Sequence, residues 1–217
     1  MKDECCIVGA GPSPLYWRDG AYLIAADGGL AKLQAVGITP DLILGDFDSL
    51  DGRPSDVIAE TLTFPIEKDD TDTMLAIKEA LRRGYRRLYL SGGLGGRLDH
   101  TIANLQALGY AEAHGAEAYL VGEGQTVVLL TCGTARFHRR CRGIFSVFAF
   151  GDTAEDVTVS GAKYPADAIT LTNRFPLGVS NAFTEEGETV LSVKQGTLLL
   201  VFTGTPDDVQ FMTGRNP

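Results

Sequence analysis

The stretch RRLYLSGGLGGRLDH, residues 86–100, contains the pattern on which the fold prediction rests. An apolar strand-like run leads into a glycine-rich loop, and the helix-like segment TIANLQALGYAEAHG follows and ends at Gly115. The same order recurs upstream, in CCIVGAG, in YLIAADGG with GLAKLQAVG, and in DLILGDFD followed by TDTMLAIKEALRRG. Repeated alternation of strand and helix predicts an α/β fold, a Rossmann-like parallel sheet with helices on both faces.

The second half of the chain has a different pattern of segments. TVVLL, GIFSVFAF, DVTVSG, AITLT, ETVLSV and GTLLLVFTG are short, β-branched or aromatic, and separated by turn residues. Such a series predicts an all-β antiparallel sandwich or barrel. We therefore expect two domains, residues 1–122 and residues 123–217.

Charge and composition restrict the class of partner. The 217 residues have a formal net charge of −9 at pH 7, and 44% are hydrophobic. Binding to nucleic acid needs clustered lysine and arginine, so we expect no nucleic-acid partner. No run is long enough to span a membrane, and the N-terminus lacks the long apolar segment of a signal peptide. The four cysteines match no zinc spacing and are expected to be buried free thiols, which suits a cytoplasmic protein.

Aspartates gather where predicted strands end and where a predicted helix begins. They are Asp27, Asp46 and Asp48 at strand ends, and Asp69, Asp70 and Asp72 in KDDTD at the helix start. A single aspartate in such a place often only caps backbone N–H groups. Ligands of doubly wound sheets bind at the carboxyl ends of strands, where several converging carboxylates would repel one another unless a cation lay among them. An oxygen-only site of this kind suits Mg²⁺.

An EF-hand calcium site is the alternative for these acids. Starting at Asp46, DFDSLDG has Leu50 where the third ligand belongs and Asp51 where glycine belongs, which excludes it.

The loop SGGLGGRLDH provides groups that suit a phosphate. Glycines such as Gly93 and Gly95 let backbone N–H groups approach phosphate oxygens, and Arg97 can form a forked pair of hydrogen bonds with them. Lys68 precedes the acidic run and could also balance phosphate charge. A purely structural glycine turn and a solvated surface lysine remain the alternatives. Together, acids, glycine loop and cations indicate a nucleotide-triphosphate site.

Four motifs in this order, AADGG, GDFDS, EKDDTD and GGLGGRLDHTIANL, resemble the thiamine pyrophosphokinase (thiamine diphosphokinase) family. The resemblance continues through SGAKYP, GVSNAF and GTLLLVF. It implies an N-terminal α/β domain that binds ATP and Mg²⁺, a C-terminal β-sandwich that binds thiamine, and a homodimer with the site shared between subunits. The reaction implied is transfer of a pyrophosphoryl group from ATP to the hydroxyl of thiamine, which yields thiamine diphosphate and AMP.

The resemblance also implies roles for single residues. The metal-binding acids correspond to Asp46, Asp48 and Asp72, and these three with Asp99 are the expected catalytic residues. The residues expected at the ATP site are Asp27, Lys68, Thr71, Gly93, Gly95, Arg97, His100 and Asn104. Tyr164, Ser180 and Asn181 are expected at the thiamine pocket, although Tyr164 could be a core aromatic residue and the other two turn residues.

Two other functions stay open at this point. One is a pyrophosphokinase acting on another alcohol such as a pterin, because its ATP machinery would look alike. The other is a non-catalytic sensor that binds a nucleotide or thiamine. A sensor has little need for converging carboxylates, and the SGAKYP and GVSNAF motifs argue against a pterin acceptor.

Overall fold

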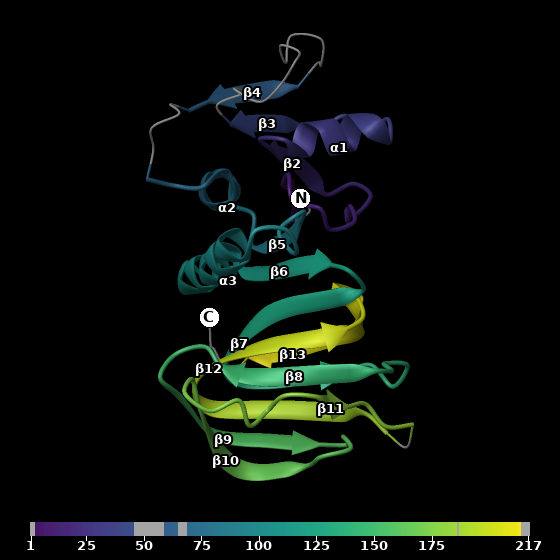
Figure 1. The fold of residues 1–217 in the computed structure, drawn as a ribbon, viewed down its shortest axis with the longest axis vertical. Helices are drawn as coiled ribbons and strands as arrows, with labels where there is room; N and C mark the ends of the chain where they lie inside the picture. Colours follow the sequence, from purple (N-terminus) through teal and green to yellow (C-terminus); the bar gives the residue numbers. More distant parts are fainter. Residues whose placement is uncertain (1–2, 46–58, 65–68, 186, 214–217) are drawn as a thin grey trace. The chain divides into compact units, whose positions relative to one another are not determined.

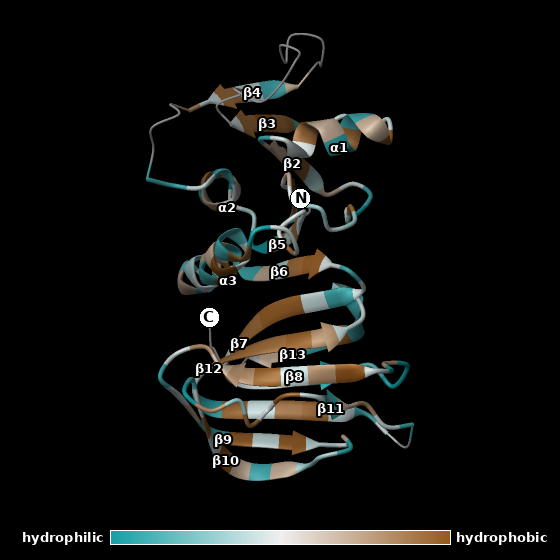
Figure 2. Cartoon of the chain, viewed as in Figure 1, coloured by the Kyte–Doolittle hydropathy of each residue, from teal (hydrophilic) through white to brown (hydrophobic). Residues whose placement is uncertain are grey.

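The structure is a computed structural model that describes residues 3–45, 59–64, 69–185 and 187–213. Contacts divide the chain into two compact units, Met1–Glu123 and Gly124–Pro217. Each unit has its own strands, as Figure 1 shows, and each has buried apolar side chains of its own. Apolar residues run along the strands of both units, as Figure 2 shows.

The first unit contains a parallel sheet. Its strands lie in the order β6, β5, β1, β2, β3, β4, and each described pair is parallel. Adjacent side chains of β1 point to opposite faces, yet Cys5, Cys6, Ile7 and Val8 are all buried, so both faces of the sheet centre are covered. The strands are β1 (Glu4–Val8), β2 (Tyr22–Ala26), β3 (Leu42–Gly45), β4 (Glu60–Thr63), β5 (Arg87–Ser91) and β6 (Glu117–Gly122).

The helices of this unit begin close to the carboxyl ends of the strands. They are α1 (Gly29–Ala35), α2 (Asp72–Arg82) and α3 (Leu98–Ala113). The Thr71 hydroxyl caps α2 by accepting a hydrogen bond from the Met74 amide at 3.2 Å. Buried residues Asn104, Ala107, Leu108 and Ala111 recur at helical spacing and form the covered face of α3.

The strand order places a topological switch point at β1. From β1 the chain builds outward through β2, β3 and β4, and then returns to the other side of β1 with β5. The loops that follow β1 and β5 therefore diverge from the same sheet edge. Ligands of open α/β sheets bind at such a point.

The second unit is antiparallel throughout its described strand pairs. The long strand β12 pairs with β7 over most of its length, with β9 along its first part and with β8 along its second part. Its strands are β7 (Gln125–Phe137), β8 (Ile144–Ala149), β9 (Thr153–Ser160), β10 (Ala166–Thr172), β11 (Asn181–Ala182), β12 (Thr189–Thr203) and β13 (Val209–Thr213), with a 3-10 turn η2 (Pro206–Asp208) before the last.

Aromatic side chains form the centre of this second core. The ring centroid of Phe137 lies 5.2 Å from that of Phe202, and the centroid of Phe145 lies 4.9 Å from that of Phe183. Burial alternates along β8, β9 and much of β12, as expected for strands with one face on a core. The α/β half and the all-β half thus form the mixed fold expected from the sequence.

The expectation of buried thiols is correct for three cysteines and wrong for the fourth. Cys5, Cys6 and Cys141 are buried free thiols, but Cys132 is exposed. Cys132 lies at a left-handed position (φ 45°) in β7, between Thr131 and Gly133, where the pairing of β7 with β12 shifts register. Among the described residues, no helix has the length and apolar character needed to cross a bilayer.

Candidate functional site

Two glycine turns meet at the switch point. The amide of Gly9, after β1, donates to the carbonyl of Ser91 at 2.8 Å, and the amide of Gly11 donates to the carbonyl of Gly92 at 2.9 Å. A Cβ added at Gly11 would lie 2.3 Å from the Gly92 oxygen, and one added at Gly92 (φ +72°) would lie 2.1 Å from the Gly9 oxygen. The turns are therefore in direct backbone contact, which side chains at these positions would prevent.

A lysine from α1 supports the first of these turns. The Lys32 ammonium donates to the carbonyl oxygen of Gly11 and, at 3.0 Å, to that of Ser13. Partial burial lowers the pKa of Lys32. Two carbonyl groups of the turn are thus satisfied by one cation, which fixes the backbone between Gly11 and Ser13.

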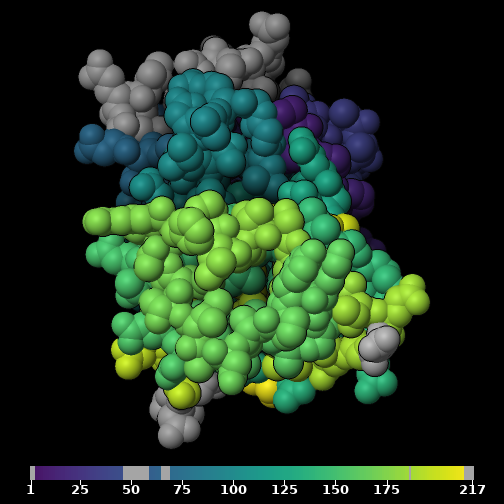
Figure 3. All heavy atoms as spheres, turned by 60° about the horizontal axis from the view of Figure 1, so that its bottom comes forward, coloured from purple at the N-terminus to yellow at the C-terminus, as the bar shows by residue number. Residues whose placement is uncertain are grey.

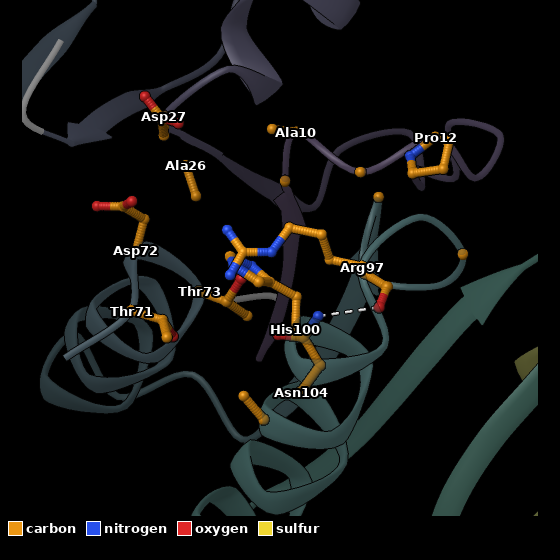
Figure 4. A pocket seen from close by; sticks show the side chains of 16 residues that line it. Ala10, Pro12, Ala26, Asp27, Thr71, Asp72, Thr73, Arg97, His100 and Asn104 are labelled. Atoms are coloured by element: carbon orange, nitrogen blue, oxygen red, sulfur yellow. Dashed lines mark hydrogen bonds between the residues drawn. The ribbon is translucent and has the colours of Figure 1, made fainter. Parts of the chain in front are cut away.

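Carboxylates approach the same edge from β2 and α2. Asp27 directly follows β2 in a left-handed conformation (φ 47°), and its amide donates to the Leu44 carbonyl at 2.7 Å. Asp72 is the first residue of α2, next to the capping Thr71. Figure 4 shows Asp27 and Asp72 on one side of the pocket and Arg97 and His100 reaching in from the other. A left-handed non-glycine residue at a strand end is a strained conformation that often marks a functional site.

The start of α3 contributes the cation of the pocket. Arg97 precedes α3 and forms a two-point ion pair with Asp99, with Nη2–Oδ2 at 2.6 Å and Nε–Oδ1 at 3.1 Å. This arginine holds the pKa of Asp99 below its usual value. About two turns further along, the buried Asn104 amide donates to the Gly93 carbonyl at 2.9 Å and so fixes the second glycine turn.

These groups surround one cavity of about 410 Å³ within the first unit. Asp99 does not line it, but it contacts two lining residues, through the ion pair with Arg97 and by accepting a hydrogen bond from the His100 amide at 3.0 Å. The lining residues are Gly9, Ala10, Gly11, Pro12, Ala26, Asp27, Thr71, Asp72, Thr73, Gly92, Gly93, Gly95, Arg97, His100, Ala103 and Asn104. The structure thus brings together eight of the residues expected at this site from the sequence.

Three of the expected residues cannot be placed. Asp46, Asp48 and Lys68 lie outside the residues that the structure describes. Within the described ranges, no group of three histidine, cysteine, aspartate or glutamate side chains is arranged to hold a metal ion. The described acids at the cavity are Asp27 and Asp72.

The sequence-based prediction missed the turn after β1. Gly9, Ala10, Gly11 and Pro12 line the cavity as fully as the loop after β5. The available signal was the stretch GAGP, in which two glycines follow an apolar strand just as the glycines of SGGLGG do. The missing information was that β1 and β5 are neighbours, because that pairing places the two turns together.

A second cavity, of about 460 Å³, lies within the second unit. Figure 3 brings this unit forward and shows a hollow among its green atoms. Tyr164 and Asn181 line the cavity. The walls are otherwise mainly apolar, and they consist of Val147, Val157, Val159, Pro165, Ala166, Asp167, Ile169, Leu171, Leu177, Gly178 and Val179.

Asn181 holds the backbone at Tyr164. Its Oδ1 accepts from the Tyr164 amide at 3.0 Å, and its Nδ2 donates to the Tyr164 carbonyl at 2.8 Å. Tyr164 is 58% exposed, so it is not a core aromatic residue. Ser180 is in a left-handed conformation (φ 59°) and does not line the cavity, and its amide donates to the Ser146 hydroxyl at 3.1 Å.

Family models match both units in order. The model of the thiamin pyrophosphokinase catalytic domain matches residues 13–120, and that of the thiamin pyrophosphokinase vitamin B1 binding domain matches residues 137–198. Together they match more than half of the chain.

Individual proteins give the same result. The chain is 27% identical over 206 residues to thiamine pyrophosphokinase of Bacillus subtilis, covering 90% of this chain and 96% of that protein. It is 29% identical over 101 residues to thiamin pyrophosphokinase 1 of Caenorhabditis elegans, covering 42% and 41%. The crystal structure of the Bacillus subtilis protein is similar in fold, with a TM-score of 0.84, 24% identity, and coverage of 93% and 99%. That of thiamin pyrophosphokinase from Geobacillus thermodenitrificans has a TM-score of 0.78, 26% identity, and coverage of 94% and 99%.

Proposed function

Because this chain belongs to the thiamine pyrophosphokinase family, we propose that the first cavity is where it carries out the family reaction. That reaction is ATP-dependent transfer of a pyrophosphoryl group to thiamine. The products are thiamine diphosphate and AMP. The observation that carries the proposal is the pair of glycine turns at the switch point, facing Asp27 and Asp72 on one side and Arg97 on the other.

The glycine turns bind the phosphates of ATP in this proposal. The amides of Gly9 and Gly11 hold the two turns together through the carbonyls of Ser91 and Gly92, and other backbone N–H groups of the turns can approach phosphate oxygens that side chains would keep away. Arg97 adds a guanidinium that suits phosphate oxygens, and Asp99 acts as the residue that orients it. The ion pair between Arg97 and Asp99 supports that role for Asp99. Thr71, His100 and Asn104 complete the ATP side of the cavity.

Aspartate oxygens fit a bound Mg²⁺. Hard cations take oxygen ligands, and Asp72 presents a carboxylate to the cavity from the start of α2. Asp46 and Asp48 are proposed to complete the metal site with Asp72. When bound, Mg²⁺ would neutralise charge on the phosphate oxygens. The task of the protein is then to hold the β-phosphorus in line with the thiamine hydroxyl, and in this proposal Asp72 accepts a hydrogen bond from that hydroxyl.

Thiamine is assigned to the cavity of the second unit. An aromatic side chain, Tyr164, at the edge of mainly apolar walls suits the flat pyrimidine and thiazolium rings. Asn181 positions Tyr164, and Ser180 shapes the turn beside it. We further propose that the second unit is a β-sandwich, that the first is Rossmann-like, and that a cytoplasmic homodimer shares each site between two subunits. The two cavities lie in different units of the chain, and a shared site would bring their ligands together.

The test is one incubation of the protein with ATP, Mg²⁺ and thiamine, followed by phosphorus NMR. We expect the signals of AMP and thiamine diphosphate to grow together, with no ADP, and to stop growing when EDTA is added. AMP formed with a pterin alcohol but not with thiamine would identify another pyrophosphokinase. Binding of ATP and thiamine without AMP would identify a sensor.

A further inference from the structure

The second cavity contains one feature that its apolar walls do not explain. Asp167 is the charged residue in a lining otherwise made of apolar residues, Tyr164 and Asn181. The carboxylate is exposed, and no ion pair or hydrogen bond joins it to another described side chain. A carboxylate beside an apolar wall and an aromatic ring suits a ligand that is both flat and positively charged.

A β-bulge brings Asp167 to the cavity. Ala166 pairs with Val159 and Ile169 pairs with Val157, so strand β10 has one residue more than β9 between these two pairs. Ala166, Asp167 and Ile169 all line the cavity, although adjacent side chains of a regular strand point to opposite faces. Bulges redirect side chains in this way and often lie next to functional sites.

The backbone of this bulge is strained and held in place. Ala168 is in the left-handed region (φ 48°), which is unfavourable for a residue with a Cβ. Its amide donates to the Thr158 hydroxyl of the neighbouring strand at 3.1 Å. A strained conformation kept by a specific hydrogen bond is expected where the direction of a side chain matters.

We infer that Asp167 determines the specificity of the second cavity for a cationic ring, by placing a carboxylate beside the thiazolium of bound thiamine. This inference rests on the proposed function, which assigns thiamine to this cavity. Asp167 contacts the substrate at a ring that does not react. It therefore contributes to binding and not to the chemical step.

A nearby lysine and the edge position of β10 could each account for a carboxylate at residue 167 without a ligand. Lys163 lies beside the cavity, with its ammonium 5.3 Å from the centroid of the Tyr164 ring, and Asp167 could simply balance that charge. In addition, β10 pairs only with β9 among the described strands, and edge strands use bulges and charges to prevent aggregation. Both roles predict that thiamine binding does not depend on Asp167.

The experiment compares Asp167→Asn with wild type in the full chain. An exposed ion pair of this type is worth up to about fivefold in affinity, so we expect the KM for thiamine to rise by about that factor. The KM for ATP and the kcat at saturating thiamine should not change. Calorimetric titration with thiamine should show the same loss of affinity, and about 1 M salt should reduce the difference.

Two controls make the result specific. A neutral analogue of thiamine, with an uncharged ring in place of the thiazolium, should bind wild type and Asp167→Asn equally well. In a Lys163→Met background, Asp167→Asn should still weaken thiamine binding, whereas recovery of normal affinity would mean that Asp167 only balances Lys163. Aggregation of Asp167→Asn with an unchanged affinity for thiamine would assign Asp167 to edge protection and overturn the inference.

The failure of this inference is distinguishable from failure of the proposed function. If wild type formed no thiamine diphosphate, the proposed function would be wrong whatever Asp167 does. If wild type formed it and Asp167→Asn bound thiamine normally, only the role of Asp167 would be wrong.

Discussion

Gly92 occupies a position that needs both a left-handed backbone and the absence of a side chain. Its φ is +72°, and an added Cβ would lie 2.1 Å from the Gly9 carbonyl oxygen. Gly115 has nearly the same φ, +75°, but an added Cβ there would meet nothing within 4 Å. Alanine substitutions at these two positions therefore distinguish the cost of backbone strain from the cost of steric contact.

We predict that Gly92→Ala is much more harmful than Gly115→Ala. Gly115→Ala should lower the free energy of unfolding by about 1 kcal/mol through strain alone, and Gly92→Ala by about 3 kcal/mol, because the two turns must also separate. The KM for ATP should rise by about tenfold or more for Gly92→Ala and not for Gly115→Ala. The reason is that backbone amides of the turn around Gly92 bind phosphate in the proposed site. Urea unfolding and steady-state kinetics measure both effects. Equal effects of the two variants would show that the turns are not in tight contact.

Lys32 supports the first glycine turn without lining the cavity. Its ammonium donates to the carbonyls of Gly11 and Ser13, so Lys32→Met would leave both without that donor. Losing a partly buried charged donor costs about 1–3 kcal/mol, and the loosened turn should bind phosphate less well.

We predict that Lys32→Met raises the KM for ATP by about tenfold and leaves the KM for thiamine unchanged. Lys194→Met is the matched control, because the interaction of Lys194 among the described residues is an exposed ion pair with Asp156 in the second unit. Kinetics with each substrate varied in turn measure the split. Parallel rises in both KM values would show a general loss of structure and contradict the specific role of Lys32.

At the scale of elements, the C-terminal end of α2 is fixed by a charge network that keeps its N-terminal end at the cavity. Glu79 accepts hydrogen bonds from Arg82 and Arg83, and Arg83 also reaches Glu60 on β4 and the hydroxyl of Tyr22 on β2. Hydrogen bonds from Arg82 hold the pKa of Glu79 below its usual value of 4.5. A carboxylate with a lowered pKa in the folded state stabilises the fold above its ordinary pKa, and that contribution is lost as the pH falls through the folded-state value.

We predict that Glu79→Gln lowers the free energy of unfolding at pH 7 by about 2 kcal/mol, because a largely buried acceptor of charged hydrogen bonds is removed. The difference from wild type should shrink as the pH falls from about 5 to 3. Urea unfolding over this pH range measures it, with Glu155→Gln, an exposed carboxylate on β9, as the control. A difference that stays constant over the pH range would mean that the charge of Glu79 is unimportant.

The helices were predictable because their signals are local. TDTMLAIKEALRRG contains a capping threonine, an apolar stripe and a final glycine, and α2 runs from Asp72 to Arg82 within it. Strand β4 was not predicted, since Glu60–Thr63 is short, largely exposed and has no apolar alternation. Its place in the sheet comes from pairing with β3, which is tertiary information.

The candidate site was predictable only in part, for a related reason. Acids at strand ends and at a helix start indicated a common sheet edge, and Asp27 and Asp72 do line one cavity. The contact between the turns at Gly9 and Gly92 depends on β1 and β5 being neighbours. Residues far apart in a sequence show no local sign of such a pairing. The role of Asn181 was hidden likewise, because it acts on the backbone of Tyr164, 17 residues away.

At the scale of the whole molecule, the two cavities differ in chemistry and belong to different units. The first has glycine turns, carboxylates and an arginine, and the second has apolar walls, Tyr164 and Asp167. In the proposed function ATP binds in the first cavity and thiamine in the second, so the reaction requires the two bound substrates to come into contact. The proposed homodimer with shared sites meets this need if the first unit of one subunit works with the second unit of its partner.

This arrangement predicts that two inactive variants regain enzymatic activity when they are mixed. Asp72→Asn damages the first unit and Tyr164→Ala the second, so each homodimer should be nearly inactive at thiamine concentrations below KM. After the variants are mixed and allowed to exchange subunits, half of the dimers are mixed, and each of these has one undamaged composite site. Activity should therefore return to about a quarter of the wild-type value. Analytical ultracentrifugation of each variant checks that both remain dimers. If the dimers exchanged subunits without regaining activity, each complete site would belong to a single chain. Both cavities of one subunit would then supply the substrates of one reaction, and the shared-site proposal would be wrong.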